Sequence, residues 1–132
     1  MMKQLIPHLT MKNCEQTINY YQEVFGGEIK NVQLADGNEM FKGHEGKYIH
    51  SELHINENCV MYMNDTFHGD VQHGNAIQLS LDLESEEEID RIYHVLSASG
   101  TVKMELQDTF WNARYAVVTD KHGITWELNV SK

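Results

Sequence analysis

Residues 85–100 read SEEEIDRIYHVLSASG, and this stretch decides the fold of the chain around it. Ser85 with Glu88 three residues later forms an S-x-x-E capping box, which satisfies backbone N–H groups at the start of a helix. Gly100 ends the segment, as glycine often ends helices. The apolar residues between these signals share one helical stripe: Ile89, Ile92, Tyr93 and Leu96. The pattern predicts an amphipathic helix.

The same pattern occurs earlier, in NCEQTINYYQEVFGG, residues 13–27. Asn13 takes the N-cap position, and the segment ends in two glycines, so it predicts a helix from about residue 14 to 25. Its apolar stripe consists of Ile18, Tyr21 and Phe25. An alternating strand precedes each helix, at residues 5–11 and 76–83, and three strand-like runs follow each. The order is βαβββ, twice.

The two halves align as one duplicated unit. Setting GEIK, residues 27–30, against GTVK, residues 100–103, brings the helix caps almost into register. We therefore predict an α+β protein with module one at about residues 1–64, a connecting loop at 65–74 and module two at about 75–132. A further loop is expected at residues 36–47, where no period is visible.

Composition limits the class of protein. The 132 residues, 41% hydrophobic, suit a single domain with its own core, small enough to gain from dimerisation. Ten Lys and Arg stand against 20 Asp and Glu, and this net charge of -10 disfavours nucleic acid and anionic membranes as partners. No run is apolar and long enough to span a bilayer, and MMKQLIPHLT, residues 1–10, contains neither the h-region nor the small-residue cleavage site of a signal peptide. We expect a cytoplasmic protein.

The two cysteines, Cys14 and Cys59, lie far apart and outside any CxxC motif. This spacing argues against a disulfide framework and a structural zinc site. We expect both to be reduced, buried and apolar in role.

The alternation of the strands separates an apolar face from a polar one. Half-solvated antiparallel sheets are common, so any single polar strand face can be ordinary surface. Such surfaces usually carry Lys, Glu and Thr, whereas this face combines residue types that act as ligands, bases or orienting groups. They are His8, His50, Glu52, His54, Gln78 and Glu127.

Residues 108–129, DTFWNARYAVVTDKHGITWELN, form a hairpin with an unusual mixture of side chains. Phe110 and Trp111 can wall a pocket, and Arg114 beside them can clamp a carboxylate or phosphonate. Alternatively, Arg114 pairs with Asp108 or Glu127 and only fixes the loop. In the first half, the run CVMYMN contains Tyr62, whose side chain alternates toward the polar face. There it would line a pocket for a small-molecule ligand.

The motifs INYYQEVFGGEI, HSEL and DTFWNARYAVVTDKHGITWEL together resemble the vicinal oxygen chelate superfamily, most closely the PhnB-like branch of the glyoxalase and bleomycin-resistance proteins. The resemblance covers essentially the whole chain. It implies cupped antiparallel or mixed sheets with helices outside, around a cavity usually completed in a homodimer. The chain departs from the branch at Asn112 and Ala116, where Gly is common, and at Lys121, where Pro is common.

The resemblance also implies a divalent metal in some members, held by four strand residues. The corresponding positions fall near Ile6, near Tyr62, at Ala76 and at Glu127. Only Glu127 suits a hard ion, and His8 and Glu52 are weak additional candidates. Because affinity depends on ligand number and arrangement, we expect no tightly bound metal.

Three functions fit these observations. The first is a small-molecule-binding homodimer of the PhnB-like branch, with an unassigned activity and no tightly held metal. The second is a metal-dependent lyase or dioxygenase that uses His8, Glu52 and Glu127. The third is an antibiotic-sequestering protein without turnover. Fold alone does not choose among them.

Overall fold

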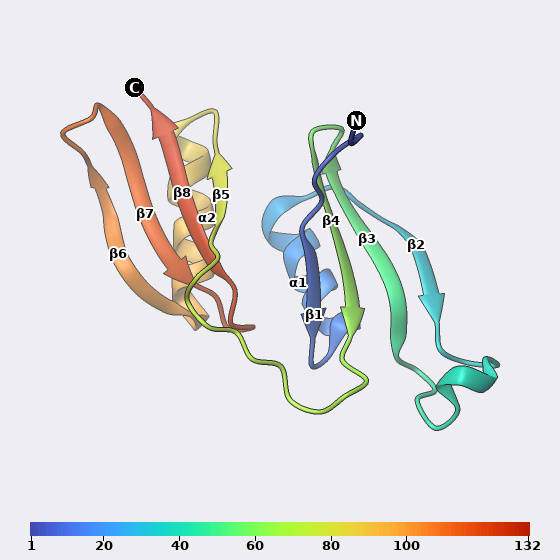
Figure 1. Ribbon diagram of the computed structural model, residues 1–132. Helices are drawn as coiled ribbons and strands as arrows, with labels where there is room; N and C mark the ends of the chain where they lie inside the picture. The colour runs from blue at the N-terminus through green and yellow to red at the C-terminus, as the bar shows by residue number, and fades with distance from the viewer. The chain divides into compact units, whose positions relative to one another are not determined.

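The computed structural model describes residues 1–132 and separates into two compact units. Module one is Met1–Val71 and module two is Gln72–Lys132, so the boundary lies inside the predicted connecting loop. Each module contains one long helix and one four-stranded sheet (Figure 1). The organisation of both modules into a single domain stays a prediction.

Module one has the predicted βαβββ order, with a short 3-10 helix inserted in the loop after its second strand. Its sheet order is β1-β4-β3-β2, in which β1 runs parallel to β4 and the other neighbours are antiparallel. The elements are β1 (His8–Met11), α1 (Cys14–Phe25), β2 (Glu28–Leu34), η1 (Glu39–Phe41), β3 (Tyr48–Asn56) and β4 (Cys59–Asp65).

Module two repeats this topology without the 3-10 helix. Its sheet order is β5-β8-β7-β6, again with one parallel pair, β5 and β8. The elements are β5 (Leu79–Asp82), α2 (Glu86–Ser99), β6 (Thr101–Asp108), β7 (Ala113–Thr119) and β8 (Thr125–Ser131). The α+β class and the duplicated βαβββ unit are thereby confirmed.

Both helices begin at the predicted caps. The Asn13 side chain accepts a hydrogen bond from the Gln16 N–H at 3.2 Å, and the Ser85 hydroxyl accepts one from the Glu88 N–H at 3.1 Å. The reciprocal half of the predicted capping box is displaced by one residue, because the Glu88 carboxylate accepts from the N–H of Glu84. The cap still removes unsatisfied donors from the first turn.

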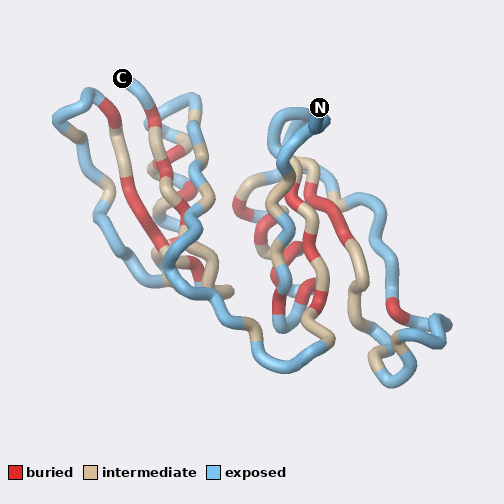
Figure 2. The backbone as a smooth tube through the Cα atoms, viewed as in Figure 1, coloured by how far each residue is buried: buried red, intermediate tan, exposed pale blue.

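The core of each module lies between its helix and one sheet face. The buried apolar residues of module one include Met11, Cys14, Ile18, Tyr21, Val24, Leu53, Met61 and Met63. Those of module two include Ile89, Ile92, Leu96, Ala116, Val118, Trp126, Leu128 and Val130. Figure 2 shows the buried segments on the helices and central strands, whereas the edge strands β2 and β6 are mostly exposed. Of the predicted stripes, Phe25 and Tyr93 are only half-buried.

Two glycines occupy equivalent places in the modules. A Cβ on Gly27 would lie 2.3 Å from the carbonyl oxygen of His54 in β3, and a Cβ on Gly100 would lie 2.3 Å from that of Thr119 in β7. After each helix, the chain therefore passes so close to the backbone of the neighbouring strand that only glycine fits at this position. This equivalence supports the alignment of residues 27 and 100 made from the sequence.

Three expectations need correction. The first strand of each module is shorter than predicted, beginning at His8 and Leu79. Pro7 has no N–H to continue the hydrogen-bond ladder of β1. In module two, Leu79 pairs with Trp126, and β8 begins only one residue earlier, at Thr125, so β5 has no partner strand before Leu79. Ile77, predicted on the apolar face, is consequently 81% exposed. Cys59 is also exposed, because it follows the β3–β4 turn, whereas Cys14 is buried as expected.

Neither helix has the length and apolar character that a membrane crossing would require.

Candidate functional site

The polar face of module one is the face of its sheet that lies opposite α1. Ser51 points toward α1, since its Oγ lies 3.4 Å from the Sγ of Cys14. The alternation of β3 therefore turns Glu52 to the polar face. Its cross-strand neighbours there are Lys30 in β2 and Tyr62 in β4. His50 and His54, two residues away on either side, share this face.

Glu52 is held by three hydrogen-bond donors, and we call it with His50, His54 and Asn31 the Glu52 centre. Its Oε2 accepts from His50 Nε2 at 2.7 Å, while its Oε1 accepts from His54 Nε2 at 2.7 Å and from Asn31 Nδ2 at 3.1 Å. The residue is only 8% exposed. The bonds from His50 and then His54 outweigh burial and lower the pKa of Glu52 to about 2. The carboxyl group is ionised at neutral pH.

The ionised carboxylate decides which nitrogen of each imidazole is the hydrogen-bond donor. An ionised carboxylate can only accept hydrogen bonds, so the Nε2 atoms of His50 and His54 must carry their protons. In a neutral ring the remaining nitrogen, Nδ1, is then an acceptor. Neither Nδ1 has a protein partner, and neither is among the buried polar atoms that lack one, so both reach the surface.

Two further rings complete this part of the face. The Tyr62 ring lies edge-on to His50, with centroids 4.9 Å apart, and His8 lies 6.3 Å from Tyr62 and 6.5 Å from His50. His8 is opposite Tyr62 in the parallel β1–β4 pair. The predicted residues His8, His50, Glu52 and Tyr62 thus come together in one cluster.

Asn31 was not predicted to take part. It has a positive φ of 54° and lies where the β2–β3 register shifts between Lys30 and Gln33. Such a bulge re-aims side chains, and Asn tolerates the left-handed conformation better than most residues. Nothing in the sequence marks this bulge, because it depends on how β2 meets its neighbour.

Module two carries a different carboxylate on its polar face. Glu127 accepts from the hydroxyl of Tyr115, and its other oxygen accepts from Ser80 Oγ at 2.7 Å. The Tyr115 bond is the main cause that lowers the pKa of Glu127. Burial and then this bond raise the pKa of Tyr115 to about 12. Sequence reasoning missed Tyr115 and Ser80, although the strand registers put both on this face.

The predicted aromatic pair extends from this group. The Trp111 ring is edge-on to Tyr115 at 5.3 Å, and the Phe110 ring is edge-on to Trp111 at 4.9 Å. Phe110 is 96% exposed and Trp111 49% exposed. Gln78 lies just before β5 and is exposed, without a contact to Glu127. The aromatic pair therefore adjoins the Glu127 group, whereas Gln78 stands apart.

Arg114 lies on the helix side of its strand. Its Nε donates to Asp90 in α2 at 3.0 Å, and its Nη1 donates to Asp108 at 3.4 Å. Hydrogen bonding to Asp90 is the main cause that raises the pKa of the guanidinium group. Asp108 is one of the two ion-pair partners that the sequence allowed, and Glu127, the other, pairs with hydroxyls instead. The guanidinium is thus engaged in joining β6, β7 and α2.

The chain's donors do not fit the four-ligand metal site that the resemblance implies. Ile6 and Ala76 offer no donor side chain, and both oxygens of Glu127 already accept hydrogen bonds. No group of three or more His, Cys, Asp or Glu side chains is placed to hold a metal ion. In the Glu52 centre, both histidine Nε2 atoms face the carboxylate rather than a common point.

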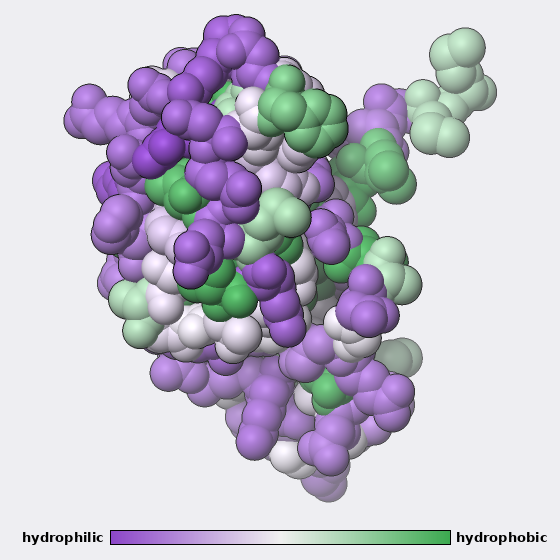
Figure 3. All heavy atoms as spheres, turned by 90° about the vertical axis from the view of Figure 1, so that its left-hand side faces the viewer, coloured by the Kyte–Doolittle hydropathy of each residue, from purple (hydrophilic) through white to green (hydrophobic).

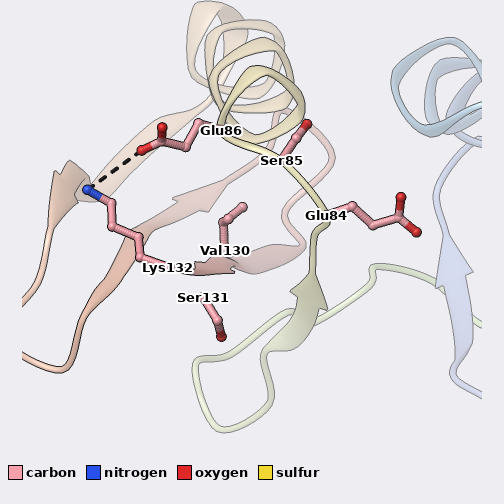
Figure 4. A pocket seen from close by; sticks show the side chains of 6 residues that line it. All are labelled: Glu84, Ser85, Glu86, Val130, Ser131 and Lys132. Atoms are coloured by element: carbon pink, nitrogen blue, oxygen red, sulfur yellow. Dashed lines mark ion pairs between the residues drawn. The ribbon is translucent and has the colours of Figure 1, made fainter.

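An open pocket of about 420 Å³ lies in module two beside the start of α2 (Figure 4). Across it, Lys132 pairs with Glu86 at 3.6 Å. Its lining consists of Glu84, Ser85, Glu86, Val130, Ser131 and Lys132. None of the predicted site residues is among them, so within module two the pocket is separate from the Glu127 group.

Comparison with known proteins gives the family. A sequence model of the glyoxalase/bleomycin resistance protein/dioxygenase superfamily matches residues 5–128. The chain belongs to this superfamily. It is similar to the protein YjdN of Escherichia coli, strain K12, with 30% identity over 97% of the chain and 95% of that protein.

Solved structures of the superfamily agree with the fold. Protein PA1353 from Pseudomonas aeruginosa is 25% identical, with a TM-score of 0.86 over 98% of each chain. The PhnB protein from Bacillus cereus is 26% identical, with a TM-score of 0.84 over 98% of this chain and 100% of its own. These neighbours confirm the resemblance to the PhnB-like branch that the sequence motifs indicated.

Proposed function

We propose that this superfamily member binds a small organic molecule on the polar face of module one, without a tightly held metal. The observation that carries the proposal is the Glu52 centre, a buried carboxylate held by His50, His54 and Asn31. Burial of a charge is costly unless it is hydrogen-bonded, so an ordinary solvated sheet face has no reason to contain one. A ligand site, in contrast, uses a few fixed polar groups for orientation.

The surrounding residues supply what such a ligand needs. Tyr62 and His8 offer ring surface beside the fixed imidazoles. In module two, the aromatic pair Phe110 and Trp111 with Glu127 gives a second candidate lining, from which the predicted contacts Gln78 and Arg114 stand apart. Mixed apolar and polar linings of this kind are typical of small-molecule sites.

We further propose that the protein is a homodimer. Two of the four edge strands expose apolar side chains that a partner would cover: Val32 and Leu34 on β2, and Val102 and Met104 on β6. Figure 3, viewed from the side of β6, shows hydrophobic groups standing among hydrophilic ones. Exposed edges invite pairing with another chain. Sedimentation equilibrium should give about twice 15.3 kDa, and a monomer at every concentration would contradict the proposal.

The binding function is tested by a thermal-shift screen of small organic molecules followed by NMR of the histidine ring signals. A true ligand raises the melting temperature by mass action and moves the signals of His50 and His54. If compounds stabilise the protein without moving these signals, the Glu52 centre is not their site. If no compound in a broad screen binds, the proposal is wrong.

Elemental analysis of dialysed protein separates the alternatives. We expect no stoichiometric divalent metal, whereas one metal per chain would favour the lyase or dioxygenase that uses His8, Glu52 and Glu127. Tight binding of an antibiotic that is recovered unchanged would favour the sequestering protein. Both measurements use the full-length chain.

A further inference from the structure

We propose that the Glu52 centre selects a ligand with a protonated amine attached to an apolar body. This inference rests on the proposed function, and it specifies the chemical class of the ligand. It follows from the hydrogen-bond acceptors, the charge and the aromatic rings on the polar face of module one.

The two imidazoles of the Glu52 centre each leave a hydrogen-bond acceptor on this face. Glu52 fixes the Nε2–H groups of His50 and His54 toward itself, so their Nδ1 atoms present lone pairs. The Tyr62 ring lies beside His50, and its hydroxyl oxygen can accept a hydrogen bond as well as donate one. A ligand that offers N–H donors matches these acceptors, whereas a carboxylate, which can only accept, does not.

The negative charge of the Glu52 centre also favours a cationic ligand. At a pH where both imidazoles are neutral, all three donors to Glu52 are neutral N–H groups, and none of them is then a cationic partner for its negative charge. Lys30, its cross-strand neighbour, is paired with Glu28 at 3.8 Å. Arg114, the anion clamp that the sequence suggested, belongs to module two and is bound there to Asp90 and Asp108. The chain as a whole carries a net charge of -10. An ammonium group is attracted under these conditions and an anion is repelled.

The aromatic surface is compatible with a cation. The Tyr62 and His50 rings meet edge-on at 4.9 Å, with His8 beside them. A tyrosine ring attracts a cation to its face through its quadrupole. The same rings cover the apolar body of a ligand, so one face serves both parts of an amphipathic amine.

The test compares three probes that share one aromatic body: benzylamine, benzyl alcohol and benzoate. Binding to the full-length chain is followed by the histidine ring signals in NMR at about pH 8, where an ordinary imidazole is neutral and benzylamine is charged. We expect benzylamine to move the His50 and His54 signals with an affinity about tenfold above that of benzoate, a difference of about 1.4 kcal/mol. Benzyl alcohol should lie between them.

Glu52→Gln keeps the shape and removes the charge, and it should reduce the affinity for benzylamine about tenfold while leaving benzyl alcohol within about threefold. The matched control is Glu57→Gln, which removes the same charge from the exposed β3–β4 turn and should change neither affinity. If Glu52→Gln fails to fold, the three probes on the wild type still decide the question.

The outcomes separate this inference from the function beneath it. Benzoate binding as tightly as benzylamine, or equal binding of all three, would overturn the amine preference and leave small-molecule binding intact. A loss of benzylamine affinity in Glu57→Gln equal to that in Glu52→Gln would overturn it as well, because only overall charge would then matter. Absence of any shift at His50 and His54 with these probes and with the screened compounds would overturn both.

Discussion

The two modules place a carboxylate on the same kind of sheet face but on different strands. In module one, Glu52 on β3 faces Tyr62 on β4. In module two, Glu127 on β8 faces Val117 on β7, and its acceptors are filled by hydroxyl groups. Glu52 is nearly buried, while Glu127 is half-buried.

The difference between the partners decides what each carboxylate can do. A hydroxyl that donates to a carboxylate has only its own oxygen left, whereas an imidazole has a second nitrogen across the ring. Glu52 therefore fixes the outward Nδ1 atoms of His50 and His54 as acceptors, whereas Glu127 fixes no such second atom. One duplicated topology thus carries two different sites, because function lies in side chains and not in the fold.

The largest expected effect concerns the glycines that the modules share. Gly27→Ala and Gly100→Ala each force a Cβ against a backbone carbonyl oxygen at 2.3 Å, so each should lower the free energy of unfolding by more than about 3 kcal/mol. Gly27→Ala should be the worse because its φ is +92°. Urea denaturation measures both.

Gly26→Ala is the matched control for the backbone term. Gly26 has a φ of +82° but no atom within 4 Å of a built Cβ, so its replacement should cost only the backbone strain, about 1–3 kcal/mol. A cost for Gly100→Ala as small as this would show that the two modules do not share the close contact.

The next effect is the acid sensitivity of module one. The folded pKa of Glu52, about 2, lies below the ordinary value of 4.5, so its contribution is complete above 4.5 and is lost as pH falls toward 2. We expect a loss on the order of 2 kcal/mol after allowance for solvent screening. The stability difference between wild type and Glu52→Gln, measured by urea denaturation, should shrink over this range. A difference that does not change with pH would contradict the assignment.

A smaller effect is expected in module two. Glu127→Gln removes the carboxylate that helps raise the pKa of Tyr115 to about 12, so this pKa should fall toward its ordinary value. Stability should change by about 1 kcal/mol, as usual for one hydrogen bond. Ultraviolet titration of tyrosinate measures the pKa. Tyr48, whose pKa of about 12 depends on burial and Glu15, should not change in this variant.

The smallest effect compares the two asparagines with positive φ. Asn31→Gly and Asn112→Gly both relieve backbone strain and lose one side-chain hydrogen bond, to Glu52 and to the Lys132 carbonyl oxygen respectively. Stability should change by no more than about 0.5 kcal/mol in either variant. Only Asn31→Gly should raise the pKa of Glu52, because its bond lowers that pKa. Carboxyl NMR titration distinguishes the two, and equal titration curves would remove Asn31 from the centre.

The sequence by itself determined the elements and their order. Asn13, Ser85 and the apolar stripes act within a few residues, so both helices begin and end where local rules put them. Period two along β3 and β8 likewise separated the core side chains from Glu52 and Glu127. The residues 27 and 100 could be aligned because each half repeats the same local signals.

Only the tertiary structure decided which of these side chains meet. Asn31 reaches Glu52 through a bulge in β2, Tyr115 reaches Glu127 through the β7–β8 register, and Arg114 turns to Asp90 on α2. These partners lie 12 to 24 residues apart along the chain. Contacts at such separations depend on strand register and on the face that each element presents, which no short window of sequence contains.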